Sequence, residues 1–147
     1  MRWNPHVTVA AVVERDGRFL LVEERIDDTD YFNQPAGHWE AGETLVEAVR
    51  REVLEETAHP FEPTALVGIY QYALPHRTYL RFCFTGSVAP AERGRALDPD
   101  ILAVHWLTHD EILQRRRRLR SPMVLTCLEH YLAGRRLPLS CLHEVAP

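Results

Sequence analysis

Residues 37–59 read GHWEAGETLVEAVRREVLEETAH, and they are the most informative part of the chain. Thr44 and Glu47 have the spacing of a capping box, in which each residue satisfies a backbone N–H of the other. No proline or glycine interrupts the residues that follow, and Pro60 stands where a helix can no longer continue. The stretch therefore predicts a helix over residues 44–57.

The predicted helix has two different faces, because three- and four-residue spacings place side chains above one another. One face is apolar and carries Val46, Val49 and Val53. The other face carries the carboxylates of Glu52, Glu55 and Glu56. Like charges at these spacings repel each other, whereas a divalent cation such as Mg²⁺ is bound by converging oxygen ligands. The alternative is a solvated acidic face with ordinary ion pairs, each worth about 0.3–0.5 kcal/mol.

Arg51 lies in the middle of the acidic face, four residues after Glu47 and four before Glu55. A basic side chain at this spacing forms ion pairs with both carboxylates. We therefore expect Arg51 to bridge Glu47 and Glu55 and to hold the acidic cluster in place.

The remaining sequence mixes strand and helix signals without strict alternation. Strands are predicted at residues 6–13, 18–23, 66–74, 78–88 and 101–107, the first two joined by an Asp16-Gly17 turn. Loops are predicted at residues 27–30 and 89–99. A second capping box, Thr108 with Glu111, predicts a helix toward the arginines at 115–118, and Ser121-Pro122 starts a last helix ending near Gly134. This pattern favours an α/β protein, a mixed sheet with helices on its faces.

Composition limits the class of protein. A chain of 147 residues with 46% hydrophobic residues suits one domain, residues 1–147, with a full core. Its net charge of −4 argues against a nucleic-acid-coating protein, and no apolar run approaches the roughly 20 residues that span a bilayer. The three cysteines are widely spaced, which favours reduced thiols in the cytoplasm over disulfides or a zinc site. We therefore predict a cytoplasmic protein without nucleic-acid or membrane partners.

The spacing of residues 37–59 matches a known signature, G-x5-E-x7-R-E-U-x-E-E-x-G-U, in which U is a bulky aliphatic residue. Seven of its nine specified positions are met, by Gly37, Glu43, Arg51, Glu52, Val53, Glu55 and Glu56. Ala58 replaces the signature glycine and His59 replaces the last aliphatic residue. Through this signature the chain resembles the Nudix hydrolase family. Glycine suits a left-handed helix end, so we expect Ala58 to cost roughly 1 kcal/mol there or to shift the turn.

The resemblance extends over nearly the whole chain. Residues 5–10, 33–38, 119–122 and 136–139 are most similar to the phosphatase NudJ subfamily. The resemblance implies the Nudix fold, an α/β/α sandwich around a mixed β-sheet. This agrees with the fold class that the strand and helix pattern predicts.

The resemblance also implies the chemistry, which is attack of water on phosphorus assisted by Mg²⁺, with Mn²⁺ as a substitute. Glu52 and Glu56 are the implied principal metal ligands, with Glu55 beside them and the Gly37 carbonyl as a further ligand. Arg51 and Glu43 are implied to orient this cluster, so the expected catalytic residues are Glu43, Arg51, Glu52 and Glu55. For the general base, loop carboxylates outside the signature are alternatives to the glutamates. Asp98 and Asp100 are the candidates, against an ordinary Asp-Pro-Asp turn.

Three residues are candidates for contacting the substrate. His38 adjoins the metal-binding region, and the alternative is a surface histidine. Arg81 falls between Leu80 and Phe82 on a predicted strand, so an inward guanidinium needs an anion, either a substrate phosphate or a partner carboxylate. Tyr72 belongs to a group of aromatic residues that could stack on a base, most of which we expect in the core. The others are Tyr31, Phe32, Trp39, Tyr70 and Tyr79.

By resemblance, the partner is a small phosphorylated substrate, a nucleotide or a pyrimidine pyrophosphate. The implied substrates are nucleoside tri- and diphosphates and hydroxymethylpyrimidine pyrophosphate, for a monomer or a homodimer. Two alternatives remain: a hydrolase of another diphosphate, such as a nucleotide sugar or an oxidised nucleotide, and a non-catalytic nucleotide-binding module. The intact carboxylates argue against the non-catalytic module.

Overall fold

The computed structural model describes residues 2–147. The strands are β1 (His6–Val12), β2 (Glu14–Arg15), β3 (Arg18–Ile26), β4 (Thr29–Asn33), β5 (Ala36–His38), β6 (Phe61–Leu74), β7 (Arg77–Val88), β8 (Ile101–Leu107) and β9 (Leu137–Pro138). The helices are α1 (Leu45–Thr57), α2 (His109–Gln114) and α3 (Met123–Leu132), with 3₁₀ turns at Arg116–Arg118 and Leu139–Cys141.

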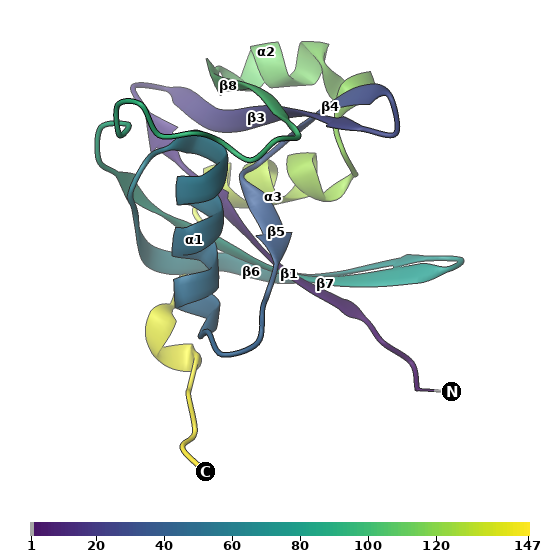
Figure 1. Ribbon diagram of the computed structural model, residues 1–147, viewed down its shortest axis with the longest axis vertical. Helices are drawn as coiled ribbons and strands as arrows, with labels where there is room; N and C mark the ends of the chain where they lie inside the picture. The colour runs from purple at the N-terminus through teal and green to yellow at the C-terminus, as the bar shows by residue number, and fades with distance from the viewer. Residues whose placement is uncertain (1) are drawn as a thin grey trace.

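The strands form two sheets (Figure 1). The first has the order β5-β1-β7-β6-β9, and it is mixed because β1 and β7 are parallel while its other pairs are antiparallel. The second sheet is antiparallel. Strand β8 pairs along one edge of β3, and β2 and β4 pair with successive parts of its other edge. The predicted Asp16-Gly17 turn joins β2 to β3, with positive φ at both residues.

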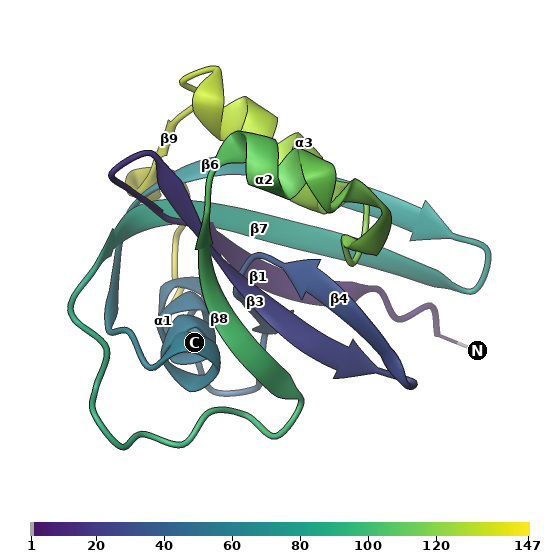
Figure 2. The same cartoon turned by 90° about the horizontal axis from the view of Figure 1, so that it is seen from above.

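Helices cover both faces of the first sheet. Alternate residues of β1 point to opposite faces, so Val9 and Ala11 share a core cluster with Val49 and Val53 of α1. Ala10 and Val12 belong to a second cluster, which includes Val124, Cys127 and Leu128 of α3. Figure 2 shows α1 and α3 on opposite sides of β1 and β7. This layering confirms the predicted α/β/α sandwich around a mixed sheet.

Helix α1 begins and ends where its sequence predicts. The Glu47 N–H donates to Thr44 Oγ1 over 3.1 Å, and the Thr44 N–H donates to Glu47 Oε1 over 3.3 Å, which confirms the capping box. Ala58 follows the helix with φ of 62°, the left-handed conformation expected there, and its N–H donates to the Leu54 carbonyl.

Other boundaries differ from the predictions because long-range pairing extends or shortens the elements. The predicted loop at residues 27–30 is confined to a two-residue turn, since Thr29 and Asp30 pair with the end of β3. Arg25 and Asp30 also form an ion pair of 2.8 Å across this hairpin. Glu111 does not complete the second capping box, because its carboxylate pairs with Arg18 at 3.1 Å. No helix within residues 2–147 has the length and hydropathy of a membrane span.

Candidate active site

Three carboxylates from two segments meet beside α1. Glu52 and Glu56 are buried on the helix, and Asp98 approaches them from the loop between β7 and β8. One carboxylate oxygen of each residue lies within 4.8 Å of the others. Figure 1 shows this loop passing over the C-terminal end of α1, where the Asp98 N–H donates to the Glu55 carbonyl over 3.0 Å.

The electrostatics of this cluster fit a cation. Burial, above all, raises the pKa of Glu56 to about 9, although a hydrogen bond from the Ala36 N–H opposes the shift. Burial likewise raises the pKa of Glu52, and the negative charges of Glu55 and Asp98 add to the effect. Two buried carboxylates and the half-buried Asp98 provide hard oxygen donors for a divalent ion, which would compensate their charge. The donor set therefore fits Mg²⁺ or Mn²⁺.

Arg51 holds the exposed side of the cluster. Its Nε and Nη2 atoms donate to the two carboxylate oxygens of Glu43 over 3.0 and 2.8 Å, a bidentate pair. Nη1 donates to Glu52 over 2.8 Å, and Nη2 also donates to the His38 carbonyl over 2.9 Å. These bonds lower the pKa of Glu43 and raise the pKa of Arg51. Arg51 thus joins the loop before α1 to a candidate metal ligand.

The partners of Arg51 differ in part from the predicted ones. Glu55 pairs with Arg51 at 3.3 Å as expected, but Glu47 caps the helix instead. The Glu55 side chain is 36% exposed and lies outside the group that Glu52 and Glu56 form with Asp98. A loop aspartate therefore joins the two helical glutamates, and the ligand role of Glu55 stays a prediction.

Strand β5 closes the cluster from the sheet side. The Ala36 N–H donates to Glu56 Oε1 over 2.8 Å. At Gly37, an added Cβ atom would overlap the Glu52 carboxylate, so any other residue here would displace this carboxylate from its place beside Glu56 and Asp98. The position of Gly37 against Glu52 is compatible with the predicted ligand role of its carbonyl, which stays a prediction.

A cavity of about 390 Å³ adjoins the cluster and includes Ala36 and Gly37 in its wall. The three predicted substrate residues, His38, Tyr72 and Arg81, all line it. It is also lined by residues from three further segments, Glu24 of β3, Asp100 of the loop before β8, and Arg120 and Ser121 before α3. The two aspartates of the Asp-Pro-Asp turn therefore face different places, Asp98 the carboxylate cluster and Asp100 the cavity.

Arg81 is buried at this cavity, with a residual exposure of 3%. Its Nη1 donates to Gln34 Oε1 over 3.0 Å and its Nη2 to Asn33 Oδ1 over 3.2 Å. Within residues 2–147 no carboxylate lies at ion-pair distance from Arg81, so its partners are these two amides and the Cys127 sulfur, 4.0 Å from Nη1. Reasoning from sequence missed Asn33 and Gln34 as site residues. Asn33 is the last residue of β4 and Gln34 follows it, three residues before Gly37. This position close to the Nudix signature was the signal that the sequence offered.

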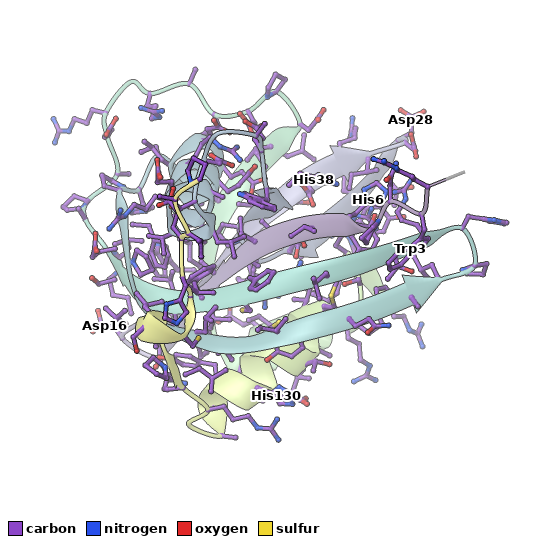
Figure 3. The ribbon with its side chains drawn as sticks, turned by 90° about the horizontal axis from the view of Figure 1, so that it is seen from below. Trp3, His6, Asp16, Asp28, His38 and His130 are labelled. Atoms are coloured by element: carbon purple, nitrogen blue, oxygen red, sulfur yellow. The ribbon has the colours of Figure 1, made fainter. Side chains whose placement is uncertain are left out.

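His38 and Tyr72 line the cavity from different strands, β5 and β6. His38 Nε2 is 3.1 Å from His6 Nδ1, and Figure 3 labels both side chains, which lie close together. Partial burial and the neighbouring His6 lower the pKa of His38. Tyr72 stacks on Tyr79 with ring centroids 6.5 Å apart and planes inclined by 19°.

Comparison with known proteins identifies the family, since the model of the NUDIX domain matches residues 4–126. The chain belongs to the Nudix family. It is 43% identical to "Phosphatase NudJ" of Escherichia coli K12 over 143 residues, which cover 97% of this chain and 93% of that protein.

Solved structures agree with this assignment. A NUDIX hydrolase from Nitrosomonas europaea superposes with a TM-score of 0.94 at 46% identity, over 97% of this chain and 98% of that one. A MutT NUDIX hydrolase from Burkholderia pseudomallei, 22% identical, shares the fold with a TM-score of 0.70 over 87% of this chain and 98% of the other. The chain is accordingly a Nudix hydrolase, an enzyme that acts on phosphoanhydrides.

Both departures from the Nudix signature hold the loop that carries Asp98. Ala58 adopts the left-handed conformation of the signature glycine, and its carbonyl accepts the N–H of Glu92 over 2.9 Å. His59 is buried, with its Nδ1 2.7 Å from the Ala89 carbonyl oxygen, where the imidazole N–H donates. A histidine at the aliphatic position of the Nudix signature thus anchors the start of this loop.

The other aromatic candidates of this Nudix chain divide between core and surface. Phe32 is buried in the core cluster that faces α3. Tyr70 packs against this cluster, and its hydroxyl lies 2.9 Å from His130 Nδ1. Trp39 is 47% exposed, and its indole N–H donates to the Glu43 carbonyl over 2.7 Å. Of the six aromatic candidates, only Tyr72 and Tyr79 line the cavity.

Proposed function

We propose that the chain is a Mg²⁺-dependent hydrolase of the NudJ type, with Mn²⁺ as a substitute, that cleaves phosphoanhydride bonds of nucleoside tri- and diphosphates. Hydroxymethylpyrimidine pyrophosphate is a further proposed substrate. The observation that carries this proposal is the cluster of Glu52, Glu56 and Asp98 beside a cavity that is lined by aromatic residues. The proteins to which the chain is similar include a phosphatase and hydrolases with the same fold.

In this proposal Glu52, Glu56 and Asp98 hold the metal, and Gly37 adds its carbonyl oxygen. Bound Mg²⁺ supplies charge neutralisation at the phosphate oxygens and a more acidic water. The substrate occupies the adjoining cavity, so its phosphates reach the carboxylate cluster past strand β5.

The remaining charged residues are assigned by their exposure and contacts. Arg51 and Glu43 orient Glu52, because Arg51 bonds both carboxylates. Glu55 is the proposed general base, since its carboxylate lies beside the cluster and is accessible to water. Asp100, which faces the cavity, is the alternative base.

The test is a substrate screen with Mg²⁺ that measures phosphate and pyrophosphate separately. It includes nucleoside tri- and diphosphates, hydroxymethylpyrimidine pyrophosphate, nucleotide sugars and oxidised nucleotides. Release of phosphate from the first three classes supports a NudJ-type phosphatase, and turnover restricted to the last two classes would contradict it. Binding of nucleotides without turnover at saturating Mg²⁺ would identify a non-catalytic module.

A further inference from the structure

A chain of hydrogen bonds at the floor of the cavity fixes the direction of two amide groups. Gln34 Nε2 donates to the buried carbonyl of Val124 over 2.8 Å, so its oxygen is the atom that accepts from Arg81. The same guanidinium donates to Asn33 Oδ1, which leaves the NH₂ group of Asn33 for another acceptor. Burial raises the pKa of Glu24, which lines the cavity, and the neighbouring Asn33 side chain opposes this shift. Asn33 therefore stands between the hydrogen-bonded groups of Val124, Gln34 and Arg81 and the carboxylate of Glu24.

The charges along this chain explain why it ends in a carboxylate. The Arg81 guanidinium is only 3% exposed, and its hydrogen-bond partners are two amide oxygens, with the Cys127 sulfur at 4.0 Å. A charge buried in this way is stabilised by a negative charge nearby. Glu24, Arg81 and Arg120 line the same cavity, and the two guanidinium charges oppose the rise in the pKa of Glu24 that burial causes. Glu24 is itself half-buried on the cavity side of β3.

We propose that Glu24 determines substrate specificity by accepting a hydrogen bond from an N–H group on the edge of a planar heterocycle. This inference rests on the proposed function, because it concerns the organic part of the same phosphorylated substrate. Arg81 and Asn33 are positioning residues that orient Glu24. Arg81 thus acts on the substrate through Asn33 and Glu24 and not as a phosphate ligand.

The walls of the cavity suit a flat ring. The stacked pair of Tyr72 and Tyr79 lines it, and Ile26 and Met123 add apolar surface. Arg120 adds N–H donors in the same cavity, so acceptor and donor occur together, as the edge of a nucleobase requires. An ionised carboxylate only accepts hydrogen bonds, and it repels a ring carbonyl placed against it.

The test uses nucleotide pairs that exchange an amino group for a carbonyl oxygen, namely CTP with UTP and ATP with ITP. We expect the native enzyme to differ at least about 10-fold in kcat/KM within one pair, as for a hydrogen bond to a charged group. Glu24→Gln presents a donor and an acceptor with the same shape, so the ratio should fall to within about threefold of unity. Glu23→Gln is the matched control, because the neighbouring Glu23 bonds His105 and Arg118 instead and should leave the ratio unchanged.

A second variant separates positioning from packing. Asn33→Ala should move the ratio of kcat/KM within a pair in the same direction as Glu24→Gln does. Loss of packing alone would instead lower kcat/KM for both nucleotides of a pair by the same factor. Equal ratios in the native enzyme and Glu24→Gln would overturn the proposal, and so would a native enzyme that does not discriminate within either pair.

Binding of nucleoside monophosphates provides a readout that needs no hydrolysis. Calorimetric titration with AMP and IMP, and with CMP and UMP, should show the same loss of discrimination in Glu24→Gln. If no nucleotide is hydrolysed but this binding pattern is found, the proposed function fails while the role of Glu24 stands. Hydrolysis with binding that is indifferent to Glu24→Gln would overturn the role of Glu24 alone.

Discussion

Replacing Glu56 with glutamine should abolish most turnover and, without metal, stabilise the fold. The change keeps the shape of a side chain that is 6% exposed, and glutamine can still accept the hydrogen bond from the Ala36 N–H. It removes the negative charge that the proposed metal site requires. Turnover with Mg²⁺ should therefore fall by about 10²–10⁴-fold, or roughly 3–5 kcal/mol in the activation free energy.

The effect on stability follows from the pKa of Glu56, which burial raises from 4.5 to about 9. A carboxyl group with a raised pKa contributes stability that is fully present below pH 4.5 and is lost as pH rises toward 9. At pH 7.5 this loss spans three pH units, each worth about 1.36 kcal/mol, so it reaches up to about 4 kcal/mol. Glutamine has no such loss, and Glu56→Gln should unfold at a higher temperature than the native chain at this pH.

The assay is thermal unfolding in a chelator at pH 5 and pH 7.5, combined with kinetics at saturating Mg²⁺. Glu129→Gln is the matched control, since Glu129 is an exposed glutamate on α3 and should change neither quantity. The native chain, but not Glu56→Gln, should also gain more stability from Mg²⁺ as pH rises, because the ion replaces a proton. Native-like turnover in Glu56→Gln would refute the metal site. Destabilisation of this variant without metal would refute the electrostatic argument.

One binding measurement and two substitutions test other parts of the site. Mg²⁺ should bind more tightly with a non-hydrolysable nucleotide than without one, because substrate phosphates complete its coordination; equal affinities by calorimetry, corrected for Mg²⁺ held by free nucleotide, would contradict this. Ala58→Gly should leave thermal stability unchanged or raise it by up to about 1 kcal/mol, since Ala58 has φ of 62°, and a clear loss would show that its buried methyl group outweighs the strain. Arg51→Lys should lower kcat about 10-fold or more while a urea titration shows a folded protein, because lysine cannot reproduce the bidentate pair with Glu43; an unchanged kcat would remove Arg51 from the positioning role.

Local chemistry in the sequence determined the elements of this protein. The capping box of Thr44 and Glu47 sets the start of α1, and the left-handed Ala58 lies at its end, as the signature predicts. Strand β8 has the predicted limits, 101–107, because a short apolar run leaves little choice of boundary. The Nudix signature likewise determined which carboxylates lie on one helix, since their spacing is a property of the helix itself.

Tertiary structure decided which side chains meet. Asp98 joins Glu52 and Glu56 because hydrogen bonds hold its loop on the end of α1. The spacing of residues along the helix does not specify this contact with a distant loop. The partners of Arg81 are amides and not a carboxylate, which depends on how β4 and α3 approach β7. Glu24 enters the cavity for the same reason: the second sheet brings its strand against the first. Periodicity and capping act within one segment, whereas these contacts depend on how several segments pack together.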